Sequence, residues 1–136
     1  MGDFDWPRQQ GFAVVQAYEV CYQSLAHLMA RVRESIGQAP CYLSVEIDGI
    51  DPSFAGGTGT PEIGGLSVPQ ALEIIRSGRG LNLVDADLVE VSPPYDASGN
   101  TALLGAAVRN AVRAAWRCVP VISWATRNAR ALYPQP

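Results

Sequence analysis

The sequence has no lysine, and its only histidine is His27. Its positive charge therefore comes from arginine alone, and the net charge is −3. Cysteine is also scarce. The three cysteines, Cys21, Cys41 and Cys118, are an odd number without CxxC spacing, so we expect reduced, buried thiols in an intracellular protein rather than disulfides or a zinc site.

Long apolar runs are missing too. No stretch of about 18 apolar residues is present, so we expect no membrane span. The first ten residues show neither the basic nor the apolar region of a secretory signal. The chain of 136 residues is nevertheless 48% hydrophobic, which suffices for the core of one domain.

The arginines do not suggest a nucleic-acid-binding surface. Arg109, Arg113 and Arg117 recur at intervals of four, as along one stripe of a helix. A stripe of three in a mildly acidic chain is more often a solvated face. We therefore expect no nucleic-acid partner.

Apolar spacing and turn residues predict alternating strands and helices. The expected strands are 12–19, 41–47 and 81–91, and the expected helices are 21–36, 67–77 and 100–116. Gly37 should end the first helix, and Ser67 with Gln70 has the form of a capping box. Segment 53–65, with five glycines and Pro61, should be a loop. This order favours an α/β fold with a parallel sheet covered on both faces.

Carboxylates follow two of the expected strands where each ends. Glu46, Asp48 and Asp51 lie at the end of the strand at 41–47 or just beyond it, and Glu90 lies at the end of the strand at 81–91. The carboxyl ends of parallel strands meet at one edge, where ligands gather. The glycine-rich loop should lie on the same edge. The pattern predicts a site for a hard divalent metal ion or a cationic substrate.

More than one interpretation fits these acids. Glu46 and Asp48 are two residues apart, so in a strand they share one side, and two oxygens there suit Mg²⁺ or Mn²⁺. Alternatively, Asp48 and Asp51 only cap the turn, and for Asp51 a structural role is favoured. His27 lies in an amphipathic helix, where packing is more common than metal binding. The glycine-rich loop lacks a P-loop lysine and should shape a pocket instead.

Two segments carry a specific resemblance. They are "YLSVEIDGIDPSFAGGTGTPEIGGLS" and "ALEIIRSGRGLNLVDADLVEVSPPYDASGNTALL". Together they resemble the carboxyl-terminal half of agmatinases, in the ureohydrolase (arginase) family, with the animal mitochondrial type nearest. The resemblance implies a three-layer α/β/α arginase-like fold with a mainly parallel sheet. Residues 1–116 would be an incomplete, carboxyl-terminal portion of that fold, and 117–136 a divergent tail.

The resemblance also implies an activity. Such enzymes use two Mn²⁺ ions and a bridging hydroxide to hydrolyse guanidino compounds, for instance agmatine to putrescine and urea. By motif, Glu46 and Asp48 match two metal-binding aspartates. Glu90 matches the glutamate that grips the guanidinium group, and Thr60 matches a threonine close to the substrate. A mitochondrial location and a homo-oligomer are implied as well.

The sequence also departs from the family pattern. Glu46 stands where the family has aspartate, and Gly56 where it has proline. The remaining metal ligands, a histidine and a D-A-H-x-D motif, are absent from this chain. We therefore expect an incomplete metal site and no turnover by this chain alone. The alternatives are a non-enzymatic fragment that associates with or inhibits a full-length ureohydrolase, and a small carboxylate-based Mg²⁺ or Ca²⁺ module.

Overall fold

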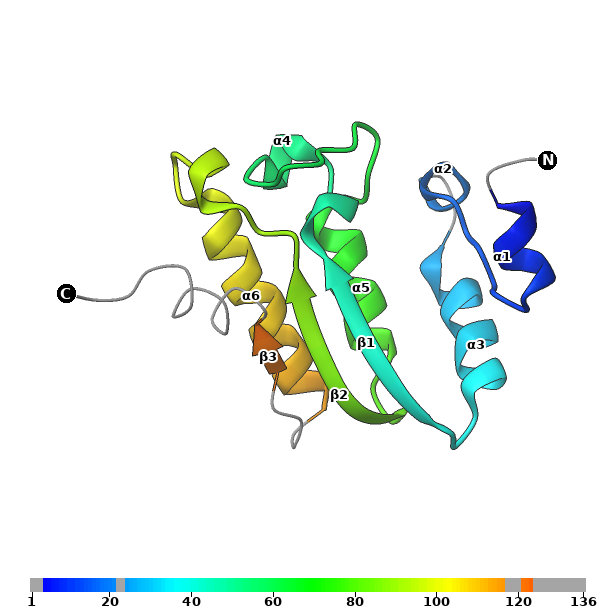
Figure 1. Ribbon diagram of the computed structural model, residues 1–136. Helices are drawn as coiled ribbons and strands as arrows, with labels where there is room; N and C mark the ends of the chain where they lie inside the picture. The colour runs from blue at the N-terminus through cyan, green and yellow to red at the C-terminus, as the bar shows by residue number, and fades with distance from the viewer. Residues whose placement is uncertain (1–3, 22–23, 117–120, 124–136) are drawn as a thin grey trace.

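A computed structural model describes residues 4–21, 24–116 and 121–123 (Figure 1). Helices and strands alternate along most of the chain. The helices are α1 Asp5–Gln9, α2 Ala17–Val20, α3 Leu25–Ile36, α4 Pro52–Ala55, α5 Val68–Ser77 and α6 Asn100–Ala115, with short 3₁₀ turns η1 Ile47–Gly49 and η2 Pro93–Tyr95. The strands are β1 Pro40–Glu46, β2 Asn82–Val89 and β3 Val121–Ser123.

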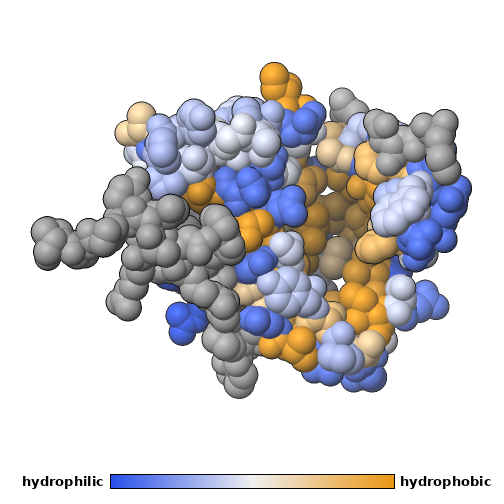
Figure 2. All heavy atoms as spheres, viewed as in Figure 1, coloured by the Kyte–Doolittle hydropathy of each residue, from blue (hydrophilic) through white to orange (hydrophobic). Residues whose placement is uncertain are grey.

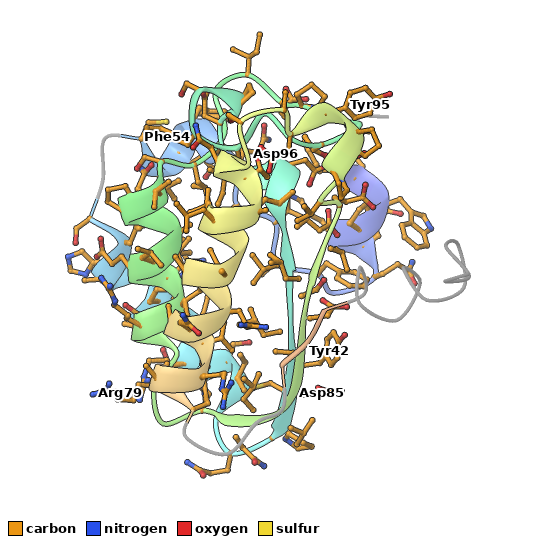
Figure 3. All side chains as sticks on the ribbon, turned by 90° about the vertical axis from the view of Figure 1, so that its left-hand side faces the viewer. Tyr42, Phe54, Arg79, Asp85, Tyr95 and Asp96 are labelled. Carbon is orange, nitrogen blue, oxygen red and sulfur yellow. The ribbon has the colours of Figure 1, made fainter. Side chains whose placement is uncertain are left out.

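The three strands form a parallel sheet in the order β1-β2-β3. Helices α5 and α6 pack together on one of its faces (Figures 1 and 3). On that side Leu43 and Val45 of β1 pack against the core, whereas Tyr42 and Ser44 on the opposite face are exposed. The predicted α/β fold with a parallel sheet is confirmed. In the described residues, however, helices cover only one face.

The core lies between the sheet and the two helices. Helix α6 buries four apolar residues in this core: Leu104, Val108, Val112 and Ala115. Helix α5 begins with the predicted capping box, in which Ser67 and Gln70 each accept a hydrogen bond from the other's backbone N–H. Periodicity and end signals therefore located both helices to within about one residue.

The strand predicted at 12–19 is wrong. Residues 12–16 have no regular structure, and α2 follows at Ala17–Val20. The Glu19 side chain accepts a hydrogen bond from the Gln16 N–H at 2.9 Å and thereby closes the start of that helix. Phe12 and Tyr18 are 63% and 67% exposed. A strand needs a hydrogen-bonded neighbour, and in the described part of the chain this segment has none.

Helix α3 confirms the prediction for 21–36 but begins at Leu25. It ends at Gly37, whose φ of 56° suits glycine.

The expectation of buried thiols is wrong for Cys21, which is exposed, while Cys41 is half-buried and both are free. Arg109 and Arg113 are exposed, as predicted. Arg117 and Cys118 lie outside the described residues.

An apolar groove of about 740 Å³ separates α3 from β1. Figure 2 shows it as an apolar hollow between the amino-terminal part and the sheet. Among the residues described, no strand pairs with the edge of β1 that faces this groove. None of the described helices has the length and apolar character needed to span a bilayer.

Candidate functional site

The glycine-rich loop closes on itself at its base. Ile50 and Leu66 form a parallel bridge, in which Asp51 N–H donates to Leu66 O at 3.0 Å and Leu66 N–H donates to Gly49 O at 2.9 Å. The loop predicted at 53–65 is confirmed, except that the short helix α4 occupies its beginning. Both ends of the loop are thereby held beside the end of β1.

Asp51 has the structural role that was favoured for it. Its Oδ1 accepts the Ser53 N–H and its Oδ2 accepts the Gly64 N–H, each at 2.9 Å. The hydrogen bond from the Ser53 side chain, followed by those from the two backbone N–H groups, lowers the pKa of Asp51 below its ordinary value. A charged Asp51 therefore ties the start of the loop to its far end.

Asp48 and Thr60 are brought together by this loop. The Thr60 hydroxyl donates to Asp48 Oδ2 at 2.7 Å, across twelve residues of sequence. Asp48 lies in η1, next to the fully buried Ile47. Because β1 ends at Glu46, the strand alternation used to predict a shared side for Glu46 and Asp48 does not extend to Asp48.

Glu46 is exposed at the last position of β1. The strand register pairs it with Val89, the residue before Glu90. Glu46 and Glu90 therefore end neighbouring strands at the same edge of the sheet, as the sequence predicted.

Glu90 lines a pocket of about 550 Å³ at the end of β2. Gly59 of the glycine-rich loop and Ser92 line the same pocket. The φ of Glu90 is 63°, which among the described residues makes it the one non-glycine residue with positive φ. Such backbone strain concentrates at functional sites. Thr60 and Asp48 do not line this pocket.

Sequence reasoning missed Asp87 in this pocket. Asp87 and Ser44 are register partners on the open face of the sheet, and both line the pocket. The Tyr42 hydroxyl donates to Asp87 Oδ2 at 2.7 Å. Asp87 Oδ1 is buried and has no hydrogen-bond partner among the described residues. The available signal was the presence of two acids, Asp85 and Asp87, inside a largely apolar strand, where burial of a carboxylate is costly.

The described residues alone do not fit a binuclear manganese centre. None of their histidine, cysteine or carboxylate side chains form a group of three that could hold a metal ion. Asp48 already accepts a hydrogen bond from Thr60, and His27 is exposed on α3. Mn²⁺ prefers several oxygen or nitrogen ligands around one ion. Glu46 and Asp48 could supply two carboxylates to such a centre, but not the whole of it.

Comparison with known proteins places this geometry in a family. A model described as "Arginase family" matches residues 1–113. Guanidinobutyrase of Pseudomonas aeruginosa is 65% identical over 104 residues, which cover 76% of this chain and 33% of that protein. Mitochondrial agmatinase of Gallus gallus is 62% identical over 97 residues, 71% of this chain and 28% of the relative. The chain thus spans about a third of the length of the curated relatives it matches.

The fold agrees. The crystal structure of a hypothetical agmatinase from Burkholderia thailandensis superposes with a TM-score of 0.77 at 41% identity, covering 86% of this chain and 36% of that one. The layered α/β arrangement is therefore that of arginase-like proteins, and the pocket at Glu90 lies within the matched residues. From the matching family model and the shared fold we conclude that this chain belongs to the arginase family.

Proposed function

We propose that this chain carries the guanidinium-binding part of a guanidino-compound hydrolase, with Glu90 as the group that holds the guanidinium. The observation that carries the proposal is the pocket in which Glu90, with its positive φ, lies beside Gly59 and Ser92. A carboxylate can accept two parallel N–H bonds from a planar guanidinium. The resemblance of this segment to agmatinases supports the same role.

The substrate we propose is agmatine. The similar proteins have the names guanidinobutyrase, agmatinase and guanidino acid hydrolase. Two of these names refer to a guanidino group, and the third refers to agmatine, which carries one. Hydrolysis of agmatine adds water at the guanidinium carbon and breaks one carbon–nitrogen bond, so that urea and putrescine result. Thr60, which follows the pocket-lining Gly59 and donates to Asp48, would border the substrate at the margin of this pocket.

Binding and hydrolysis should separate in this chain. Mn²⁺, when bound, would supply activated water for the hydrolysis. Glu46 and Asp48 are proposed as two of the metal ligands, and the others must come from elsewhere. We therefore expect the isolated chain to bind guanidino compounds without releasing urea.

A mitochondrial location also stays a prediction, since the chain is similar to bacterial and animal proteins alike.

The test measures three quantities on one purified sample: bound manganese, urea release from agmatine, and agmatine affinity by calorimetry. We expect saturable agmatine binding, less than stoichiometric tight manganese and no urea. Glu90→Gln should abolish the binding, whereas Glu73→Gln on α5 serves as a matched control. Absent binding, or equal binding by Glu90→Gln, would refute the assignment.

We further propose that the chain associates with a longer arginase-family protein. The open edge of β1 and the groove beside it support this second function. Unpaired strand edges recruit further strands, and α3 presents half-buried apolar side chains such as Leu28 and Val32 to the groove.

Native mass spectrometry with a full-length agmatinase tests this association. Val32→Asp places a charge in the groove and should prevent the complex, whereas Val84→Asp, on an exposed position of β2, should not. A chain that stays monomeric in the mixture would rule the association out.

A further inference from the structure

A buried threonine at the start of α6 connects this helix to the glycine-rich loop. Thr101 is 1% exposed, and it lies on the side of α6 that otherwise presents apolar residues to the core. Its Oγ1 accepts the Gly57 N–H at 2.8 Å. Buried hydroxyls are kept where they satisfy another polar group, and here that group is the backbone of a loop 44 residues away.

The loop is held at Gly57 from two directions. Its N–H donates to Thr101, and its carbonyl accepts the Ser92 N–H at 2.8 Å. A Cβ on Gly57 would lie 2.5 Å from the Asp96 Cβ and 2.9 Å from the Thr101 Cβ. The backbone of the loop therefore lies too close to Asp96 and Thr101 for any residue with a Cβ, so this position requires glycine.

Asp96 fixes Thr101 in turn. Asp96 Oδ1 accepts the Thr101 N–H at 3.1 Å, and Oδ2 accepts the Ala102 N–H at 2.8 Å. Figure 3 shows Asp96 above the amino-terminal end of α6, among the loops at that end of the molecule. Asp96 thereby holds the first turn of α6 in place, and with it the Thr101 hydroxyl that accepts the Gly57 N–H.

The contacts of Gly57 with Thr101 and Ser92 lie next to the residues that line the pocket. Gly57 is two residues from Gly59, and Ser92 is two residues from Glu90, and both Gly59 and Glu90 line the pocket. Further along the same loop, Thr60 is bound to Asp48. The two hydrogen bonds of Gly57, to Thr101 and from Ser92, thus set the separation between Gly59 on the loop side of the pocket and Glu90 on the strand side.

We propose that Thr101 is a positioning residue for guanidinium binding: its bond to Gly57 sets the distance between Gly59 and Glu90. This inference rests on the proposed function of Glu90. Thr101 does not itself line the pocket of Glu90. Without its hydroxyl, the Gly57 N–H is buried without a partner, which a small movement of the loop toward water would relieve. That movement would widen the pocket.

A purely structural role would change stability without changing the pocket, and three variants separate the two cases. Thr101→Val keeps the shape and removes the acceptor, while Thr101→Ser keeps the acceptor. Val112→Ala, in the buried part of the same helix, lowers stability far from the loop. Backbone amide NMR shifts of Gly59 and Glu90 report the pocket, and calorimetry reports agmatine affinity.

We expect Thr101→Val to shift both amides and to weaken agmatine binding about tenfold or more. Thr101→Ser and Val112→Ala should retain the wild-type shifts and affinity. The inference is overturned if Thr101→Val binds like wild type with unchanged shifts, or if Val112→Ala weakens binding equally.

Failure of the proposed function gives a different result. If the wild-type chain binds no agmatine, the role of Glu90 fails, and the amide shifts alone decide the role of Thr101. Shifts in Thr101→Val that Thr101→Ser restores would then still support it, and their absence would overturn it.

Discussion

The two sides of β1 differ in how completely they are filled. Toward α5 and α6, Ile47, Val108 and Val112 are buried to within 2% of complete burial. Toward α3, a groove of about 740 Å³ remains, lined by half-buried side chains such as Val32 and Ile36. Both α3 and α6 carry an apolar stripe. Such a stripe therefore predicts which face of a helix seeks a partner, but not that this chain supplies the partner.

The largest expected loss of stability comes from a substitution on the filled side of β1. Ile47→Ala removes a fully buried side chain and should lower the free energy of unfolding by about 2–5 kcal/mol. The matched change in the groove, Ile36→Ala, should cost clearly less, because solvent already reaches that side chain. Urea unfolding of both variants gives the difference. Equal losses would show that the groove is closed in solution.

Loss of the amino-terminal cap should likewise cost more stability at α6, on the filled side, than at α3, beside the groove. Asp96→Ala removes acceptors from two N–H groups at the start of α6 and should cost about 1–2 kcal/mol. Ser24→Ala removes one longer bond, of 3.3 Å, at the start of α3 and should cost less. Thermal unfolding of the two variants provides the comparison, and the reverse order would contradict it.

A pH effect should come from the loop on the filled side. The folded-state pKa of Asp51 lies below the ordinary value of 3.8, because the Ser53 side chain and two backbone N–H groups bind the carboxylate. Its contribution to stability is therefore present above pH 3.8 and is lost as the pH falls through the lower, folded-state pKa. Asp51→Asn should destabilise at pH 6 and matter less at the lowest pH at which the chain folds. A constant difference between the two unfolding curves across this range would refute the effect.

Local signals explain what the sequence could predict. Helices 67–77 and 100–116 follow from spacing and end residues alone, so their bounds were nearly correct. The placement of Glu46 and Glu90 at one edge followed from the parallel order. The Thr60–Asp48 and Gly57–Thr101 bonds could not be foreseen, because they depend on how a glycine-rich loop folds back over twelve and 44 residues. The position of Asp87 beside Ser44 could not be foreseen either, because it depends on the register between β1 and β2.

The smallest expected effect concerns the segment wrongly predicted as a strand. Hydrophobicity there resembles that of β1, yet Phe12 is 63% exposed and lies where no neighbouring strand is described. Phe12→Ser should therefore change the free energy of unfolding by no more than about 0.5 kcal/mol, as for other exposed positions. If urea unfolding instead shows a loss comparable to Ile47→Ala, Phe12 is buried in solution. The α3 side of β1 would then be filled by the chain's own amino-terminal segment, and no second chain would be needed to cover the groove.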